Sequence, residues 1–280
     1  MRQASHVFQG PFGRVAHLHM HRGLVSHAHP HCHILIKTGG ADSAFRVGDR
    51  LCPLTDDTMV LVNAWQPHAY TPQACAAPTS ILALYMDPQW LRDMGWVDGA
   101  SGGPDFFPHP LARAGRAVQS DARALACSLS TDDPSAIGDR LDCLHQLVCD
   151  VVTGHGRTGR GAQSGCNDFR VRKALDRLKC SIGSTFTMEE IARESGLSRA
   201  QLFRGFQNTI GISPMLYFNA LRIERAVRYL AEDDGNVSDI AEKLGFSMQA
   251  HFTRFFRGNI GMTPTQYRNA VRLYQNEPVH

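Results

Sequence analysis

A repeat near the C-terminus is the feature that most limits how this chain can fold. The first copy reads Leu202-x-Arg204-x-Phe206-x4-Gly211-x2-Pro214-x2-Tyr217, and the second reads Phe252-x-Arg254-x-Phe256-x4-Gly261-x2-Pro264-x2-Tyr267. Upstream, Ile191-Ala192-x3-Gly196-Leu197-Ser198 returns 49 residues later as Ile240-Ala241-x3-Gly245-Phe246-Ser247. Each copy predicts a short helix, a glycine turn and a second helix.

Capping residues mark where these helices begin. Thr187, with Glu190 three residues later, fits a capping box, in which each side chain satisfies the other residue's backbone N–H. Ser198 and Gln201 repeat the pattern. Ser213 and Thr263 each precede a proline, which is favoured at the first position of a helix. We therefore expect helices from about residues 188, 199, 214 and 264.

Helical phase divides the second helix of each unit into two faces. Leu202 and Phe206 share a face, as do Phe252 and Phe256, and these faces should pack inward. The opposite faces carry arginine, glutamine and small apolar groups, which suit the edges of bases in the major groove. The candidate DNA-binding residues are Arg199, Ala200, Gln201, Phe203, Arg204, Gln207, Gln249, Ala250, His251, Thr253, Arg254 and Arg257.

A long segment separates the two units. Residues 214 to 231 would span about 27 Å as a helix, and successive major-groove segments lie about 34 Å apart. A single helix-turn-helix pattern also occurs in plain helical bundles. The duplication and the rigid spacer favour DNA binding over a plain bundle.

The second copy resembles the C-terminal signature of the AraC/XylS family of transcription regulators. The residues that carry this resemblance are Gly245-Phe246-Ser247-Met248-Gln249-Ala250-His251-Phe252-Thr253-Arg254-Phe255-Phe256-Arg257 and the run from Gly261 to Arg268. The resemblance covers about the last 110 residues and implies a seven-helix domain with recognition helices at 199 to 210 and 249 to 259. It also implies promoter DNA, a homodimer and, for an activator, RNA polymerase as partners. Met248 and Ala250 replace small hydroxyl residues that are common there, so we expect one phosphate contact of the family to be absent.

Charge and composition agree with such a regulator. Residues 167 to 280 contain 16 Lys and Arg against 12 Asp and Glu, whereas residues 1 to 166 contain 13 against 14. The chain has no apolar signal segment and no stretch near the ~20 apolar residues of a membrane helix, so we expect a cytoplasmic protein. Its eight cysteines lack Cys-x2-Cys spacing, which predicts reduced thiols, several in the core.

A glycine-rich segment marks the boundary between two domains. Residues 154 to 166 predict a flexible linker between an N-terminal domain, 1 to 153, and the DNA-binding domain, 167 to 280. Before the linker, residues 112 to 130 and 137 to 152 predict two helices. The second carries an apolar stripe that either packs on its own domain or forms a dimer seam, the latter favoured by the resemblance; its residues are Leu141, Leu144, Leu147, Val148 and Val151.

Residues 6 to about 90 predict short antiparallel strands. Apolar runs at 34 to 36 and 59 to 62 are separated by Gly, Asp and Pro turns, as in a small barrel. This segment resembles the cupin-like sensor of the same family. The expected fold is therefore α+β with two domains: a cupin-like β-barrel with a helical dimerisation segment, then an all-α domain with two helix-turn-helix units.

Histidines alternate twice in the barrel segment. His17, His19 and His21 form one set, and the other runs at every second position from His27 to His33; alternation places each set on one face of a strand. We predict an effector site that contains His29, His31, His33 and His68. A weaker alternative is a divalent metal on His29, His31 and His68. No glutamate precedes Glu189, so the usual carboxylate ligand of a cupin is missing, and we predict no cofactor.

Three functions follow from these features. The first is a sequence-specific regulator, not an enzyme, that responds to a small molecule in the barrel. The second is a regulator that responds to a metal ion or to pH through the histidines. The third is a metal-dependent cupin enzyme with a DNA-binding tail, which the missing glutamate disfavours.

Overall fold

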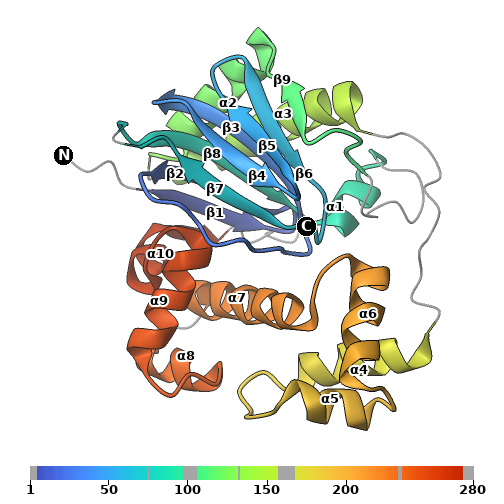
Figure 1. Cartoon of the computed structure of the whole chain (residues 1–280). Coiled ribbons are helices and arrows are strands. Elements are labelled where there is room, and N and C mark those ends of the chain that lie inside the picture. Colours follow the sequence, from blue (N-terminus) through green and yellow to red (C-terminus); the bar gives the residue numbers. More distant parts are fainter. Residues whose placement is uncertain are drawn as a thin grey trace, which may run out of the picture.

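The computed structural model describes residues 5–74, 76–96, 106–131, 133–156, 168–232 and 235–273. Its N-terminal part is a pair of β-sheets backed by helices, and its C-terminal part is helical, as Figure 1 shows. This arrangement confirms the predicted two-domain α+β fold. No helix in the described part of the chain is both long and apolar enough to cross a membrane.

Two sheets make up the N-terminal domain. The larger has the strand order β10-β1-β2-β8-β3-β6-β9 and the smaller the order β5-β4-β7. All neighbouring strands pair in antiparallel fashion except β1 and β10. The strands are β1 His6–Gly10, β2 Gly13–Met20, β3 Cys32–Gly40, β4 Ser43–Val47, β5 Arg50–Leu54, β6 Thr58–Val62, β7 His68–Pro72, β8 Thr79–Met86, β9 Leu111–Arg113 and β10 Val271–Leu273.

The large sheet buries both of its faces, which explains its long apolar runs. Along β3, Leu35 faces the core between the two sheets, while Ile34 and Ile36 face the helices behind. Those helices are α1 Pro88–Asp93, α2 Arg116–Ser128 and α3 Ile137–His155, with a short 3₁₀ turn at Pro134–Ala136. The free thiols of Cys32 and Cys52 lie in these cores, whereas Cys75 and Cys166 fall outside the described residues.

The apolar stripe of α3 packs on its own domain. Leu144, Leu147, Val148 and Val151 are all 0% exposed, and Leu141 packs against the same cluster with residues of α2 and the sheet. Only Leu141 keeps part of its surface accessible, so the structure supports the alternative in which the stripe packs on its own domain over the dimer seam.

The structure also moves two predicted helix boundaries in this region. The helix expected from residue 112 starts at Arg116, because residues 111 to 113 pair with β6 as strand β9. Helix α3 continues to His155, so it includes the first two residues of the predicted linker. The linker from 157 onward lies outside the described residues.

Seven helices form the described part of the C-terminal domain, as the family signature implied. They are α4 Phe169–Cys180, α5 Met188–Glu194, α6 Arg199–Ile210, α7 Pro214–Glu232, α8 Val237–Lys243, α9 Gln249–Ile260 and α10 Pro264–Ala270. The starts expected at 188, 199, 214 and 264 are confirmed. Capping boxes are present at Thr187, Ser198 and Thr263. Gly211 and Gly261 end the two recognition helices with φ of 79° and 88°, a left-handed conformation that glycine adopts without strain.

The two domains are in direct contact. Helix α7 runs alongside the sheets, with α4–α6 at one end and α8–α10 at the other (Figure 1). Strand β10, which follows α10, pairs in parallel with β1, so the C-terminal domain adds a strand to the sheet of the N-terminal domain. Val25 donates its backbone N–H to the Gly258 carbonyl at 3.0 Å. Residues of α7, α8, α9 and the two sheets share one apolar cluster.

Candidate functional site

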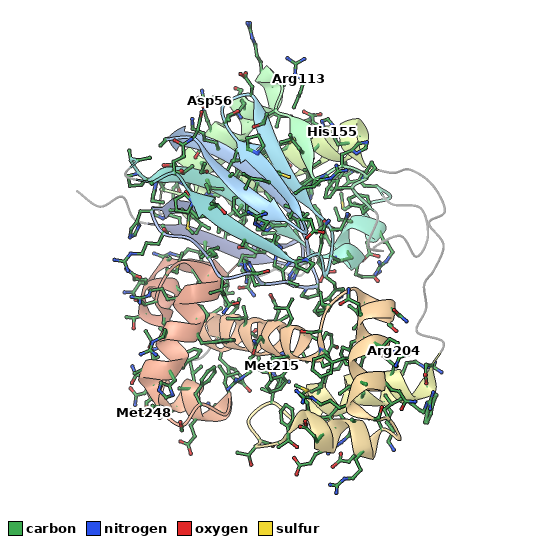
Figure 2. The ribbon with its side chains drawn as sticks, viewed as in Figure 1. Asp56, Arg113, His155, Arg204, Met215 and Met248 are labelled. Atoms are coloured by element: carbon green, nitrogen blue, oxygen red, sulfur yellow. The ribbon has the colours of Figure 1, made fainter. Side chains whose placement is uncertain are left out.

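The predicted DNA-binding residues lie on accessible faces of α6 and α9. Ten of the twelve are exposed, and Phe203 and Thr253 are half-buried. Arg204 and Arg254 occupy equivalent positions in the two units. Figure 2 shows Arg204 and Met248 at opposite ends of the helical domain. The inward residues Leu202, Phe206, Phe252 and Phe256 are each 0% exposed, so the predicted helical phase is confirmed.

Contacts within the chain separate these residues into two groups. Arg199 forms an ion pair with Glu189 at 3.2 Å, and Gln207 donates to the Gly211 carbonyl at 3.0 Å. Gln201 accepts from the Ser198 N–H in the capping box. Arg204, Arg254 and Arg257 form no hydrogen bond or ion pair with any residue in the described ranges. Because their donors are free, these three arginines are the strongest candidates for contacts with bases.

The N-terminus of α9 lacks a side-chain cap. Met248 occupies the N-cap position at 57% exposure and makes no capping hydrogen bond, whereas Ser198 caps α6 by accepting from the Gln201 N–H at 3.2 Å. Met248→Ser should therefore raise the free energy of unfolding by about 1 kcal/mol, measured by thermal melting. Ser198→Ala is the matched control and should lose a similar amount. An unchanged or lower midpoint for Met248→Ser would show that α9 gains nothing from a cap.

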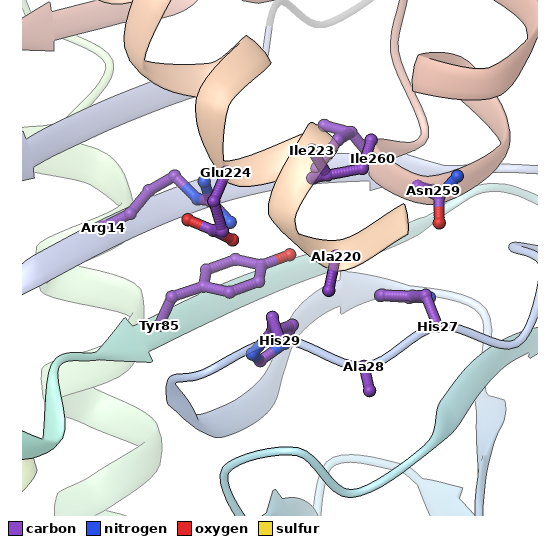
Figure 3. A pocket seen from close by; sticks show the side chains of 10 residues that line it. All are labelled: Arg14, His27, Ala28, His29, Tyr85, Ala220, Ile223, Glu224, Asn259 and Ile260. Atoms are coloured by element: carbon purple, nitrogen blue, oxygen red, sulfur yellow. The ribbon is translucent and has the colours of Figure 1, made fainter. Parts of the chain in front are cut away.

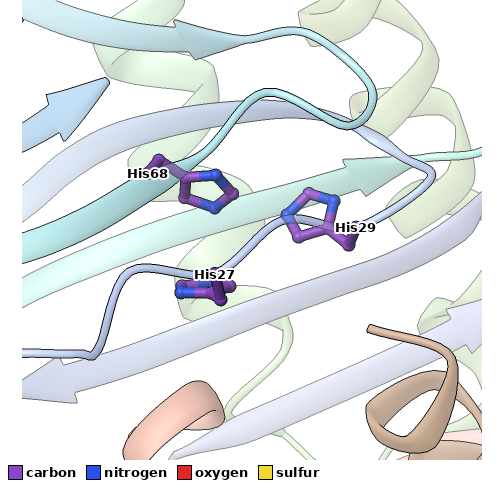
Figure 4. Close-up of side chains that lie close together, drawn as sticks. All are labelled: His27, His29 and His68. Carbon is purple, nitrogen blue, oxygen red and sulfur yellow. The ribbon is translucent and has the colours of Figure 1, made fainter. Parts of the chain in front are cut away.

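A second site lies inside the barrel, where three histidines converge (Figure 4). One ring nitrogen from each of His27, His29 and His68 lies within 4.8 Å of the others, and all three side chains are buried. His27 and His68 exchange backbone hydrogen bonds of 3.0 and 2.9 Å, which fixes the two segments side by side. His29 follows His27 by two residues, and its side chain points to the same side of the segment as that of His27.

The alternation of histidines in the sequence predicted most members of this cluster but misplaced one, His31. His33 joins it, with its ring 5.1 Å from His29 and 5.4 Å from His68, and stacks on Tyr85 at 4.0 Å. The chain bends at residues 30 and 31 before β3 begins, and His31 places its Nδ1 3.8 Å from the Glu224 carboxylate of α7. The predicted metal set of His29, His31 and His68 is therefore wrong in one residue, because His27 rather than His31 completes the close group.

Hydrogen bonds fix the tautomers of these imidazoles. The Nδ1 atoms of His27, His29 and His68 lie 2.9, 3.1 and 2.9 Å from the carbonyl oxygens of Val25, His31 and Gln66. A carbonyl only accepts, so each Nδ1 carries the proton and each Nε2 carries a lone pair. Burial lowers the pKa of all three, to about 3 for His68, and repulsion between the neighbouring histidines adds to the effect at His29 and His68. The imidazoles are neutral at pH 7.

The loop that delivers His68 is tied to the helical domain. Trp65 has φ of 64°, a left-handed conformation that costs a non-glycine residue about 1 to 3 kcal/mol. Its N–H donates to the His29 carbonyl at 2.8 Å, and its ring lies 5.0 Å from Tyr217 of α7. The strained residue therefore connects the histidine cluster to the DNA-binding domain. The sequence pattern gave no signal for this contact.

A small cavity lies between the barrel and the helical domain (Figure 3). Its free volume is about 10 Å³, room for about one water molecule. Arg14 lies beside it with its guanidinium 4.0 Å above the Tyr85 ring. Although burial opposes the charge, Tyr267, Glu224 and Tyr85 together raise the pKa of Arg14 above its ordinary value. The lining residues are Arg14, His27, Ala28, His29, Tyr85, Ala220, Ile223, Glu224, Asn259 and Ile260.

Comparisons with known proteins agree with this architecture. Residues 9–164 match the AraC-like ligand binding domain, and residues 191–270 match a helix-turn-helix domain. Uncharacterized HTH-type transcriptional regulators of Staphylococcus aureus and Haemophilus influenzae are each 31% identical, over 123 and 106 residues, which are 44% and 38% of this chain. The matched segments span only 16% and 36% of those relatives.

Solved structures match over most of the chain. Apo ToxT from Vibrio cholerae superposes with a TM-score of 0.57 and 14% identity, covering 92% of this chain and 96% of ToxT. ToxT bound to an unsaturated fatty acid gives 0.55 and 14%, covering 96% and 97%. These likenesses show a shared two-domain fold. Because the ligand-binding family model spans more than half of the sequence and the helix-turn-helix model follows it, the chain belongs to the AraC family of transcriptional regulators.

Proposed function

We propose that this chain regulates transcription by placing the exposed faces of α6 and α9 in the major groove of promoter DNA. One observation carries the proposal: Arg204 and Arg254, which have no hydrogen-bond or ion-pair partner among the described residues, stand at equivalent positions of two exposed helices. Helix α7 separates the two units and is about 28 Å long at 1.5 Å per residue. That length supports contact with successive turns of one duplex.

The proposed effector is a small molecule that binds at the end of the barrel facing α7. Imidazoles of His29, His33 and His68 supply polar groups there, with His31 at the rim beside Glu224. The solved ToxT complex contains an unsaturated fatty acid, which supports a ligand-binding role for this fold. In the present arrangement the cavity has room for about one water molecule. Effector binding therefore requires α7 to move away from the barrel.

Such a movement couples effector binding to DNA binding. The barrel holds the C-terminal end of α9 through the Val25–Gly258 hydrogen bond and holds α10 through β10. An effector that binds more tightly to the opened arrangement shifts the population toward it and changes how the two recognition helices are spaced. We place this regulator in the cytoplasm as a homodimer that contacts RNA polymerase when it activates. The four fully buried residues of the α3 stripe do not contribute to its dimer surface.

Replacing Arg204 or Arg254 should lower both the affinity and the sequence specificity of DNA binding. The preferred binding site of the wild type is first selected from a random DNA library. On that site, Arg204→Ala and Arg254→Ala should each lose about 1 to 3 kcal/mol of binding free energy, because each removes a bidentate donor to a base. Each variant should also lose sequence preference at one position of its half-site. Fluorescence anisotropy on the selected site measures the affinity, and repeated selection measures the preference.

Arg113→Ala provides the matched control. Arg113 is exposed on the barrel, on the opposite side of the molecule from α6 (Figure 2). Its replacement by alanine removes the same charge as the two test substitutions. Its affinity should stay close to that of the wild type. If Arg204→Ala and Arg254→Ala both keep the wild-type site and affinity, α6 and α9 are not the recognition helices.

A further inference from the structure

The histidine cluster has the composition of a metal site rather than of a packed core. His27, His29 and His68 are 8%, 4% and 1% exposed, and each presents one ring nitrogen within 4.8 Å of the other two. The Nε2 atoms of His29 and His68 are buried without a hydrogen-bond partner in the described part of the chain. Buried polar atoms without partners are costly, so their convergence at one point indicates a missing ligand.

The direction of the lone pairs determines what that ligand is. Because each Nδ1 donates to a backbone carbonyl, each Nε2 is a pure acceptor. Acceptors cannot satisfy one another, and the Nε2 atoms of His29 and His68 have no donor among the described residues. A cation satisfies all three at once, and a ring N–H donated to a backbone carbonyl is the usual support of a metal-bound histidine.

We propose that His27, His29 and His68 bind one divalent transition-metal ion of the zinc, cobalt or nickel type. Imidazole nitrogen is a preferred ligand of these ions. Tetrahedral coordination at about 2.0 to 2.1 Å places ligand nitrogens about 3.4 Å apart, so ring shifts of roughly 1 Å close the group around an ion. Three protein ligands leave the fourth position open to water or to a small anion.

The surroundings tolerate such a charge. The formal charges that act on His27 come from Arg14 and Glu224, which have opposite signs. His33, whose two ring nitrogens are also buried without a partner among the described residues, lies beside the site as a further neutral imidazole. Since His27 and His29 also line the cavity against α7 and α9, a bound ion would sit next to the interface between the domains. The metal site itself does not depend on the proposed DNA-binding function.

Direct titration of the full chain tests the proposal. After dialysis against chelator, Zn²⁺ and Co²⁺ are added separately, and binding is followed by isothermal titration calorimetry and by visible absorption of Co²⁺. We expect one ion per chain, a Co²⁺ spectrum typical of tetrahedral nitrogen and oxygen ligands, and no thiolate charge-transfer band. Failure of the wild-type protein to bind either ion at equimolar, micromolar concentration overturns the proposal, as does a thiolate band.

Substitutions then assign the ligands. His29→Gln and His68→Gln should each weaken binding by at least about 100-fold, because each removes one of three ligands. His17→Gln is the matched control: His17 lies in the other alternating set, bonded to Thr38, and its loss should change the affinity by less than about threefold. Wild-type affinity in both His29→Gln and His68→Gln refutes the site. If either variant unfolds by circular dichroism, X-ray absorption of the Zn²⁺-loaded wild type decides, since it must show imidazole nitrogen and no sulfur.

Discussion

Replacing Phe256 by alanine is expected to lower the free energy of unfolding by about 3 to 5 kcal/mol. The side chain is 0% exposed and its ring lies 5.7 Å from Phe252 and 5.6 Å from Tyr267, so truncation leaves a cavity that these neighbours cannot fill. Urea unfolding followed by circular dichroism measures the loss. Leu202→Ala, the equivalent change in the first unit, should cost about 2 to 5 kcal/mol.

The two substitutions should differ in how far their effects extend. Phe256 belongs to the apolar cluster that also contains the core between the two sheets. Leu202 belongs to a separate cluster of α4, α5, α6 and the start of α7, to which the N-terminal domain contributes Ala28 and Trp65. We therefore expect Phe256→Ala to shift the unfolding of both domains and Leu202→Ala to shift mainly that of the helical domain. Met215→Ala, at a position 48% exposed, is the control and should change stability by less than about 0.5 kcal/mol. A wild-type midpoint for Phe256→Ala would contradict this packing.

The helical domain was predictable because its signals are local. Capping boxes, glycine turns and apolar positions three to four residues apart each depend on neighbours within one helix, and duplication presents every signal twice. The four residues predicted to face inward are all fully buried. Residues that remain untested, such as the free arginines, differ in kind, since their role depends on a partner that the sequence does not contain.

The contact between the domains was not predictable from the sequence. Strand β10 is only three residues long, and its partner β1 lies more than 260 residues earlier in the chain. A short strand has no periodicity of its own, so only the folded domain reveals the pairing. The Val25–Gly258 hydrogen bond is equally hidden, because backbone groups of any residue can form it.

The histidine cluster was only partly predictable from the sequence. Alternation correctly indicated that histidines two residues apart share a face, and it included His27. It holds only for extended backbone, and the bend before β3 turns His31 toward α7. The absence of glutamate before residue 189 is a true property of the barrel, yet Glu224 reaches its rim from the other domain. Sequence order alone does not exclude a residue from a site that forms between domains.

Acidification of the metal-free protein is expected to remove several kcal/mol of stability. The pKa of His68 is lowered to about 3 and that of His17 to about 4, both chiefly by burial, against an ordinary value of 6.5. Between those values the unfolded chain binds more protons than the folded one, so stability is full above about pH 6.5 and falls as the pH decreases. Each such histidine contributes a slope of about 1.4 kcal/mol per pH unit until its folded pKa is reached. Urea unfolding at a series of pH values in chelator measures the slope.

His68→Gln separates this contribution from the titration of carboxylates. Glutamine removes the buried imidazole, so the variant should be less stable at pH 7 and yet lose less stability on acidification. Its slope between about pH 6 and pH 4 should be smaller than that of the wild type by up to about 1.4 kcal/mol per unit. An equal slope in both proteins would mean that His68 takes up a proton in the folded state. In that case the cluster accommodates a positive charge in this pH range, and burial does not lower the pKa of His68 to about 3.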